Sequence, residues 1–173
     1  MIQLILGGAR SGKSRLAQQL AIDAKVPVIY IATAQAGDAE MQVRIAQHQQ
    51  QRPAHWTLLE EPIDLAAQLL AHDGPDQVIL VDCLTLWMSN LLMAADPALQ
   101  SQQCEQLYAT LPSLKSQLIL VSNETGLGVV PMGQLSRRFV DEAGWMHQKL
   151  AELADEVRFC VAGLSMQLKG NSR

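Results

Sequence analysis

The chain has 173 residues, a length that suits one domain with a substantial buried core, so we expect a single domain over residues 1–173. Apolar residues make up 49% of the chain and charged residues 17%, which excludes a disordered or highly charged protein. The net charge of −4 argues against a general nucleic-acid binder, because such proteins need a basic surface. Local basic groups can still hold a small anion.

The cysteines and the apolar runs indicate in which cellular compartment the protein is expected. Cys83, Cys104 and Cys160 show no CxxC spacing and lie in or beside apolar segments, which is typical of buried thiols in a reducing compartment. The start, MIQLILGG, has no basic residue and too short an apolar run for a signal peptide. No apolar run approaches the roughly 18 residues that span a bilayer. We expect a cytoplasmic protein without stable membrane insertion.

Short apolar runs alternate with longer amphipathic stretches along the chain. Strands are expected at 2–6, 26–32, 77–82, 117–122 and 157–163, with weaker candidates for an edge or a hairpin at 55–60 and 165–169. Helices are expected at 13–24, 38–51, 62–72, 83–94, 98–111 and 132–155. This alternation predicts a three-layer α/β sandwich with a mostly parallel sheet of about seven strands. Ligands of such sheets bind at the carboxyl ends of the strands.

The segment after the first expected strand, GGARSGKS (7–14), fits the pattern G-x-x-x-x-G-K-[ST]. Its glycines let successive backbone N–H groups point at phosphate oxygens, while Lys13 can reach the β and γ phosphates and Ser14 can coordinate Mg²⁺. Because the segment lies between an apolar strand and a helix, it indicates an NTP-binding P-loop rather than a glycine-rich turn with an incidental lysine.

An acidic residue ends another expected strand, in QVILVDCLTLW. Asp82 is costly to bury without a partner, which favours a role in holding Mg²⁺ or its water shell. The alternative is an N-cap of the helix that begins near Cys83, and the two roles are compatible.

The stretch LILVSNETGLGVVP places Asn123 and Glu124 at the carboxyl end of a further strand. Gly126 and Gly128 make the loop that follows pliable. This loop either closes over a substrate or is an ordinary turn whose glycines take positive φ, and the residues alone favour neither interpretation.

One histidine shares a helix face with apolar residues. With Asp38 as a plausible N-cap, Met41, Arg44, Ile45 and His48 fall within about 100° of each other on the expected helix. A neutral imidazole can attack an α phosphate and give a phosphoramidate, because its ordinary pKa is about 6.5. The residues alone favour a buried histidine bonded to the backbone instead.

Seven segments occur in an order that is familiar. They are GGARSGKS, YIATAQ, D-x-E-M-x-x-R-I-x-x-H, RPAHW-x-x-x-E-x-P, VDCLTLWMSNLL, NETGLGVVP and AG-x-x-x-Q-x-L-A-x-x-AD. From residue 4 to about residue 169, the chain resembles the bifunctional adenosylcobinamide kinase / adenosylcobinamide-phosphate guanylyltransferase family of coenzyme B12 assembly. The P-loop alone is generic, whereas RI-x-x-H with RPAHW and the segment NE-x-G-x-G-x-VP are highly specific.

The resemblance implies two reactions on one P-loop domain. The γ phosphate of ATP or GTP passes to the aminopropanol hydroxyl of adenosylcobinamide, with Lys13 at the phosphates and Mg²⁺ held by Ser14 and Asp82. GMP from GTP is then joined to the new phosphate, which gives adenosyl-GDP-cobinamide and pyrophosphate. The second reaction passes through a guanylylated histidine that aligns with His48. The partners are therefore adenosylcobinamide, its phosphate, ATP and GTP, and members of the family associate as homotrimers.

The resemblance also implies a set of nucleotide contacts. They are Gly7, Gly8, Ala9, Arg10, Ser11, Gly12, Lys13, Ser14, Ala32, Thr33, Ala34, Gln49, Gln50, Gln51, Arg52, Glu60 and Asp82. The glutamines at 49–51 replace more charged or glycine-bearing versions, which favours contacts through the backbone there. Arg44 or Arg52 can neutralise phosphate oxygens as His48 attacks.

The remaining histidines are interpreted as structural. His55 begins an expected strand and orders the loop before it, whereas His72 and His147 lie on expected helices with no partner in view. Family members often carry Asn-Gln where this chain has Met146-His147-Gln148, which argues against a specific role for position 147.

Two other functions compete with the bifunctional enzyme. One is a P-loop small-molecule kinase without guanylyl transfer, and the other is a nucleotide-dependent switch. No N-K-x-D motif follows any expected strand, which argues against the switch. No separate arginine-rich lid follows a later strand, which argues against the plain kinase, although Arg137 and Arg138 could reach a phosphate from their helix.

Overall fold

The computed structural model describes residues 1–35, 37, 42 and 52–170. The strands are β1 (Ile2–Gly7), β2 (Val28–Ala32), β3 (Thr57–Glu60), β4 (Val78–Asp82), β5 (Gln117–Asn123), β6 (Glu156–Val161) and β7 (Leu164–Lys169). The helices are α1 (Lys13–Asp23), α3 (Leu65–Ala71), α4 (Leu84–Met93), α5 (Leu99–Thr110), the 3-10 turn η1 (Leu111–Ser113) and α6 (Gln134–Leu153). The predicted helix over 38–51, residue 42 apart, lies outside the described residues, and His48 with it.

The seven strands form one sheet in the order β3-β2-β4-β5-β1-β6-β7. The neighbours from β3 to β6 pair in parallel, and β7 alone runs antiparallel, against β6. The sheet thus places β5 between β1, which leads into the P-loop, and β4, which ends at Asp82. The predicted mostly parallel sheet is confirmed.

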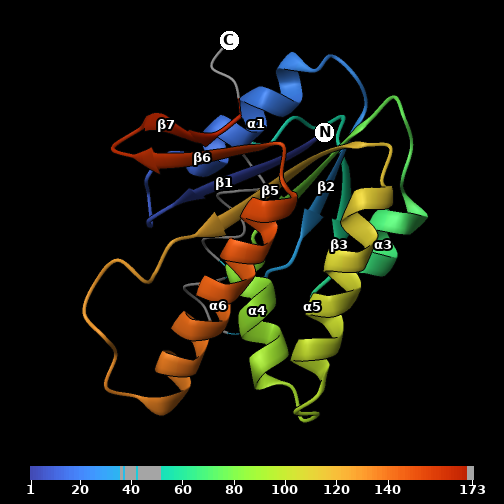
Figure 1. Cartoon of the computed structure of the whole chain (residues 1–173). Helices are drawn as coiled ribbons and strands as arrows, with labels where there is room; N and C mark the ends of the chain where they lie inside the picture. The colour runs from blue at the N-terminus through green and yellow to red at the C-terminus, as the bar shows by residue number, and fades with distance from the viewer. Residues whose placement is uncertain (36, 38–41, 43–51, 171–173) are drawn as a thin grey trace.

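Helices lie on both faces of the sheet (Figure 1), and alternating side chains of the central strands pack against one helix layer or the other. In β4, Ile79 and Val81 pack in the core beneath α3, α4, α5 and α6, whereas Val78 and Leu80 pack with Ala17 and Ala21 of α1. These four side chains of β4 are fully buried, which is why the strand is an unbroken apolar run up to Asp82. The three-layer arrangement matches the predicted sandwich.

The two weak candidate strands lie at the two edges of the sheet, as predicted. β3 is short and largely exposed, and it begins at Thr57, so His55 lies in the turn before the strand rather than at its start. β6 and β7 form a hairpin whose central residues, Ala162 and Gly163, both have positive φ, at 51° and 81°. Two-residue hairpin turns favour this geometry because its twist matches that of the strands.

The described part of the chain contains no helix that is long and apolar enough to cross a membrane. Cys83, Cys104 and Cys160 are free and buried, as their apolar neighbours predicted.

Candidate functional site

The segment from Gly7 to Ser14 connects the end of β1 to the start of α1 in a tight loop. The Ser11 amide donates to Gly8 O over 3.3 Å, and the Lys13 Nζ donates to the same carbonyl over 3.0 Å. α1 begins at Lys13, and its N-cap, Gly12, makes no side-chain capping bond. The first amides of α1 therefore keep their capacity to bind an anion such as a phosphate.

Two glycines of this loop have no room for a side chain. A Cβ at Gly7 would lie 2.5 Å from Ser11 Oγ and 2.6 Å from Cys160 O. Gly12 has a φ of 97°, and a Cβ there would lie 3.0 Å from the Gly163 Cα in the β6–β7 turn. That turn is also tied to the loop, because the Gly163 amide donates to Ser11 O over 2.9 Å. Neighbouring atoms thus approach the backbone of Gly7 and Gly12 so closely that these two positions of the motif require glycine.

Strand register brings the predicted nucleotide contacts to one edge of the sheet. Ala32, at the end of β2, pairs with Asp82 on one side and with Glu60 on the other. Gly7, at the end of β1, pairs with Asn123 of β5. These ends lie together, as expected for parallel strands, and this is the edge at which α/β sheets bind ligands. Of the other predicted contacts, Gln49, Gln50 and Gln51 lie outside the described residues.

Asp82 is bonded to a buried tyrosine rather than to a helix. Tyr30 is 4% exposed, and its hydroxyl donates to Asp82 Oδ2 over 3.1 Å. The N-cap of α4 is Cys83, with no side-chain capping bond, so the capping alternative for Asp82 is wrong. Cys83 is the N-cap because it is the last residue with an extended backbone before the first helical turn.

Tyr30 also connects Asp82 to the segment that begins at Arg52. The Arg52 guanidinium carbon lies 4.5 Å from the centre of the Tyr30 ring, and the ring of Trp56 stacks on Tyr30 with centroids 6.4 Å apart. A guanidinium over an aromatic face gains cation–π attraction. The RPAHW segment is thereby fixed beside the carboxylate at the end of β4.

The charge of Asp82 acts on the pKa of Lys13 across the site. Burial lowers the pKa of Lys13 from its ordinary value, and the negative charge of Asp82 opposes that change. The Lys13 side chain is 8% exposed overall, and no carboxylate of the described residues forms a salt bridge with it. A cation held this way is suited to receive the charge of a polyphosphate.

The predicted Mg²⁺ site is tested by the oxygen atoms that Asp82 offers. No group of three or more His, Cys, Asp or Glu that could hold a metal occurs in the described part of the chain. Mg²⁺ is usually bound through one or two protein groups, with water and substrate phosphates as its other ligands. Of the two carboxylate oxygens of Asp82, Oδ2 accepts the hydrogen bond from Tyr30. Oδ1 accepts none from the described residues, which leaves it for such an ion.

A hydrogen-bond network that the sequence did not reveal connects three strand ends. Thr33 Oγ1 donates to Cys83 O over 2.7 Å and accepts from the Cys83 amide over 3.0 Å. Thr85 Oγ1 in turn accepts from the Asn123 amide and from its side-chain Nδ2, over 3.2 and 3.1 Å. The hydroxyls of Thr33 and Thr85 thus fix the ends of β2, β4 and β5 relative to one another. No spacing signal could have found these bonds, since they connect residues far apart in the chain.

His147 has partners, contrary to the sequence interpretation. Its Nε2 lies 2.8 Å from Ser122 Oγ, and its Nδ1 lies 3.4 Å from Glu124 Oε2, within ion-pair range but short of hydrogen-bond alignment. Burial lowers the pKa of His147, although Glu124 opposes this. The sequence missed the contact because α6 meets the end of β5 only through tertiary packing.

The other described histidines stand apart from the phosphate loop. His72 is the C-cap residue of α3 rather than a helical residue, and its Nδ1 lies 3.1 Å from Gln68 O. His55 is exposed.

The loop after β5 contains Gly126 and Gly128, and neither is among the residues with positive φ. The alternative of an ordinary turn whose glycines take positive φ is therefore wrong. Closure of their loop over a substrate stays a prediction.

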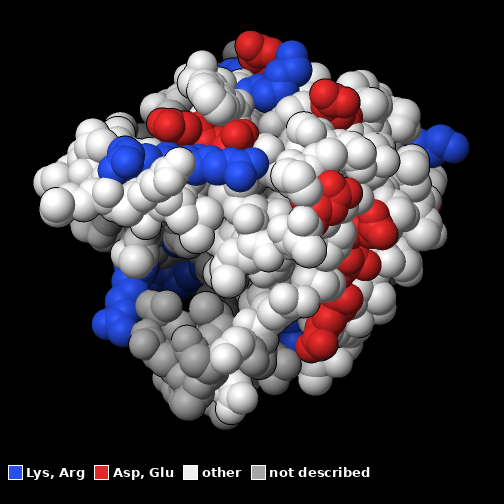
Figure 2. Space-filling view, turned by 90° about the horizontal axis from the view of Figure 1, so that it is seen from below, with Lys and Arg blue, Asp and Glu red and all other residues white. Residues whose placement is uncertain are grey.

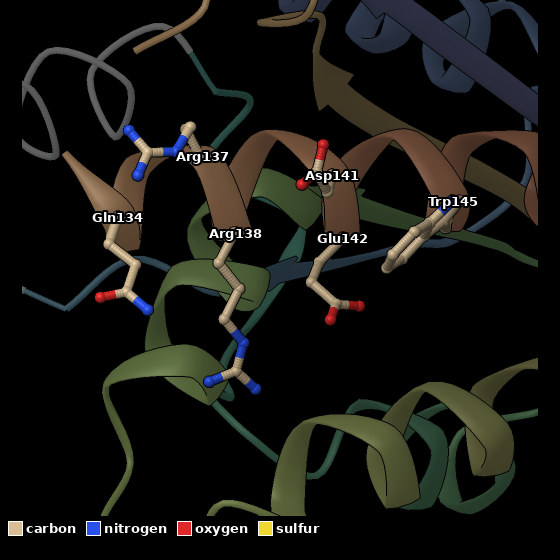
Figure 3. Close-up of a pocket in the computed structure, with 6 residues that line it drawn as sticks. All are labelled: Gln134, Arg137, Arg138, Asp141, Glu142 and Trp145. Carbon is tan, nitrogen blue, oxygen red and sulfur yellow. The ribbon is translucent and has the colours of Figure 1, made fainter. Parts of the chain in front are cut away.

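Arg137 and Arg138 lie at a hollow on α6 rather than in the P-loop. Figure 3 shows six α6 side chains around this hollow of about 280 Å³: Gln134, Arg137, Arg138, Asp141, Glu142 and Trp145. Arg137 donates to Pro131 O over 3.1 Å and to Met132 O over 2.5 Å, so it supports the loop that precedes α6. Seen from below, several Asp and Glu side chains form a row along one side of the molecule, and others lie beside Lys and Arg side chains near the top of the view (Figure 2).

Comparison with known proteins identifies the chain's relatives. The family model described as cobinamide kinase / cobinamide phosphate guanyltransferase matches residues 3–168. The chain belongs to this family. Within it, the chain is 59% identical to the bifunctional adenosylcobalamin biosynthesis protein CobP of Pseudomonas aeruginosa, over 98% of both chains. It is 41% identical to the bifunctional protein CobU of Salmonella typhimurium, over 98% of this chain and all of that one. The predicted family is confirmed.

The fold extends beyond the cobinamide kinase / cobinamide phosphate guanyltransferase family. The RadB recombinase superposes with a TM-score of 0.51 at 13% identity, over 91% of this chain and 73% of that one. This likeness supports the predicted three-layer α/β sandwich. At such low identity it shows the fold alone.

Proposed function

We propose that the chain carries out both reactions of its family, phosphorylating adenosylcobinamide and then joining GMP from GTP to the phosphate. The observation that carries the proposal is the register of the sheet edge: Glu60, Ala32 and Asp82 end three neighbouring strands, and the P-loop follows β1, which is separated from the Asp82 strand by β5 alone. The family match over residues 3–168 supports the two-reaction form of the proposal.

In the kinase reaction, the P-loop amides and Lys13 hold the β and γ phosphates of ATP or GTP. Ser14 and Asp82 would hold Mg²⁺, which supplies positive charge to the phosphoryl oxygens when it is bound. The acceptor is the aminopropanol hydroxyl of adenosylcobinamide. The low exposure of Lys13 supports its role, because a charge in a desolvated site interacts more strongly with a phosphate than one in water.

In the guanylyl reaction, His48 attacks the α phosphate of GTP. A nitrogen–phosphorus bond forms while the bond from the α phosphate to the pyrophosphate oxygen breaks. A phosphate oxygen of adenosylcobinamide phosphate then attacks the same phosphorus and releases the imidazole. Among the described residues, Arg52 is the cation nearest to His48 in sequence. Its guanidinium is held over the Tyr30 ring, which supports a role for Arg52 in stabilising the phosphate.

The nucleotide contacts outside the P-loop belong to the same proposal. Ala32, Thr33 and Ala34 follow β2, and Glu60 ends the neighbouring strand, so a base or ribose bound there meets both segments. Gln49, Gln50 and Gln51 are proposed to contact the nucleotide through their backbone.

We further propose a cytoplasmic homotrimer. The free cysteines support a reducing compartment. Exposed apolar side chains on the antiparallel edge strand, Leu164, Met166 and Leu168, support burial of that edge against another copy, because a monomer rarely leaves an apolar edge uncovered. Light scattering after gel filtration tests the trimer.

Two radiolabels separate the bifunctional enzyme from the plain kinase. The chain is incubated with adenosylcobinamide and GTP labelled at the α or the γ phosphate, and the corrinoid products are separated. We expect γ label in adenosylcobinamide phosphate and α label in adenosyl-GDP-cobinamide. Transfer of γ label without any transfer of α label would replace the proposal with the plain kinase.

A further inference from the structure

Glu124 is a carboxylate beside the P-loop that the two proposed reactions leave without a role. It directly follows β5, the strand between the P-loop strand and the Asp82 strand. Its amide donates to Gly7 O over 3.0 Å, so its backbone is bonded to the first residue of the phosphate loop. The other carboxylate at the ends of these three strands, Asp82, is accounted for by Mg²⁺ and Tyr30.

The Glu124 side chain is held in one orientation. Oε1 accepts from the Gly126 amide over 2.5 Å, and Oε2 faces the His147 Nδ1. The side chain is 20% exposed, so it is partly desolvated yet open to a substrate. No Lys or Arg of the described residues forms a salt bridge with it. A carboxylate without a permanent cation partner is free to take up a proton.

The His147 ring is itself fixed by Ser122, which is fully buried. If the ring carries its proton on Nδ1, Nε2 accepts from the Ser122 hydroxyl and Nδ1–H points toward Glu124. This tautomer makes one hydrogen bond, at Nε2, and directs the N–H of the other ring nitrogen toward the carboxylate 3.4 Å away, and hydrogen bonding of one ring nitrogen commonly sets the state of the other.

We propose that Glu124 is the base that accepts the proton of the acceptor hydroxyl in the kinase reaction, and that His147 is its positioning residue. This inference rests on the proposed kinase function. The hydroxyl oxygen of adenosylcobinamide forms a bond to the γ phosphorus while the bond from that phosphorus to the bridging oxygen breaks, which releases the nucleoside diphosphate. The hydroxyl proton moves to the Glu124 carboxylate and from there to water.

The first test is Glu124→Gln, which keeps the size of the side chain and an oxygen for the Gly126 amide but removes the base. We expect kcat of the kinase reaction to fall about 100-fold or more, the usual contribution of a general base, with little change in KM. Glu152→Gln is the matched control, because Glu152 is an exposed carboxylate of α6 that forms a salt bridge with Lys149. We expect it to behave as wild type.

The second test uses two amides that each replace one nitrogen of His147. Asn places its Nδ2 where Nδ1 lies and can still donate toward Glu124, whereas Gln places its Nε2 near Ser122 and leaves Glu124 without that neighbour. We expect His147→Asn to keep kcat within about threefold and His147→Gln to lose about tenfold, at equal melting temperatures. A merely structural histidine would give the opposite order or equal losses, and either result would overturn the positioning role.

The outcomes separate this inference from the function on which it rests. If wild type does not phosphorylate adenosylcobinamide, the proposed kinase function fails. If wild type is active and Glu124→Gln is equally fast, only the assignment of the base fails. If Glu124→Gln unfolds, Glu124→Asp decides, since a shortened carboxylate should keep more activity than a folded Glu124→Ala variant, and equal activity of the two would overturn the assignment.

Discussion

Removal of one oxygen atom, in Tyr30→Phe, isolates the bond that holds Asp82. The ring stays, so the stacking on Trp56 and the cation–π contact of Arg52 remain. Only the hydroxyl that donates to Asp82 Oδ2 over 3.1 Å is lost. Because the ring is 4% exposed, water cannot readily replace the hydroxyl.

The expected magnitude follows from the charge of the partner. A hydrogen bond to a charged group contributes about 1.5–3 kcal/mol to the free energy of unfolding, which is more than a bond between neutral groups contributes. For a chain of this size, 1 kcal/mol changes the melting temperature by about 2–4 °C, so we expect a fall of about 3–12 °C. The kinase kcat should stay near the wild-type value, because Tyr30 contacts the carboxylate and not the substrate.

Thermal unfolding of wild type, Tyr30→Phe and Tyr108→Phe measures this effect. Tyr108 is the chain's other tyrosine, and no hydrogen bond joins its hydroxyl to a carboxylate among the described residues, so its variant should lose less stability. An unchanged melting temperature for Tyr30→Phe would refute the argument that the Asp82 bond stabilises the fold. A large loss of kcat at unchanged stability would place Tyr30 among the groups that touch the substrate.

Two further predictions concern charged side chains. Lys13→Ala should lower the kinase rate about 100-fold or more while leaving the melting temperature unchanged or higher, because burial of the ammonium disfavours its charge; a γ-phosphate transfer assay and a melting curve measure both. Burial opposes ionisation of Asp73, but hydrogen bonds from Ser116 and the Lys115 amide outweigh it and lower the pKa of Asp73. The ionised form therefore stabilises the fold above the unfolded-state pKa, and this stabilisation is lost as pH falls through the folded-state pKa. Asp73→Asn should thus cost about 1 kcal/mol at pH 7 and less near pH 3 in urea unfolding, and equal costs at both pH values would contradict the assignment.

Much of the fold follows from local patterns in the sequence. Strands buried on both faces must be apolar throughout, so β1, β2, β4 and β5 were predicted within about two residues at each end. The P-loop motif is equally local in sequence, although the atoms that exclude a side chain at Gly7 and Gly12 belong in large part to the distant β6–β7 hairpin, at Cys160 and Gly163. The pairing of His147 with Glu124 and of Thr85 with Asn123 could not be predicted, because it depends on the order of the strands and on how α4 and α6 pack.

Turns and caps were predicted less well for a physical reason. A helix cap was the alternative role for Asp82, since Asp is favoured at that position, yet Cys83 is the N-cap and the carboxylate accepts from Tyr30. The strand expected over 157–163 ends at Val161, because the Ala162-Gly163 turn lies within the same apolar run. Local propensity does not tell a strand residue from a turn residue when both are apolar or small.

The central claim is that one chain transfers both a phosphate and a guanylyl group, with His48 as the covalent carrier. The most direct measurement is a pulse with GTP labelled at the α phosphate, followed by denaturation or by a chase with adenosylcobinamide phosphate. We predict protein-bound label that is acid-labile and alkali-stable, that leaves the protein during the chase, and that is absent from His48→Ala. Label retained by His48→Ala, or no label on the wild-type chain, would contradict the claim.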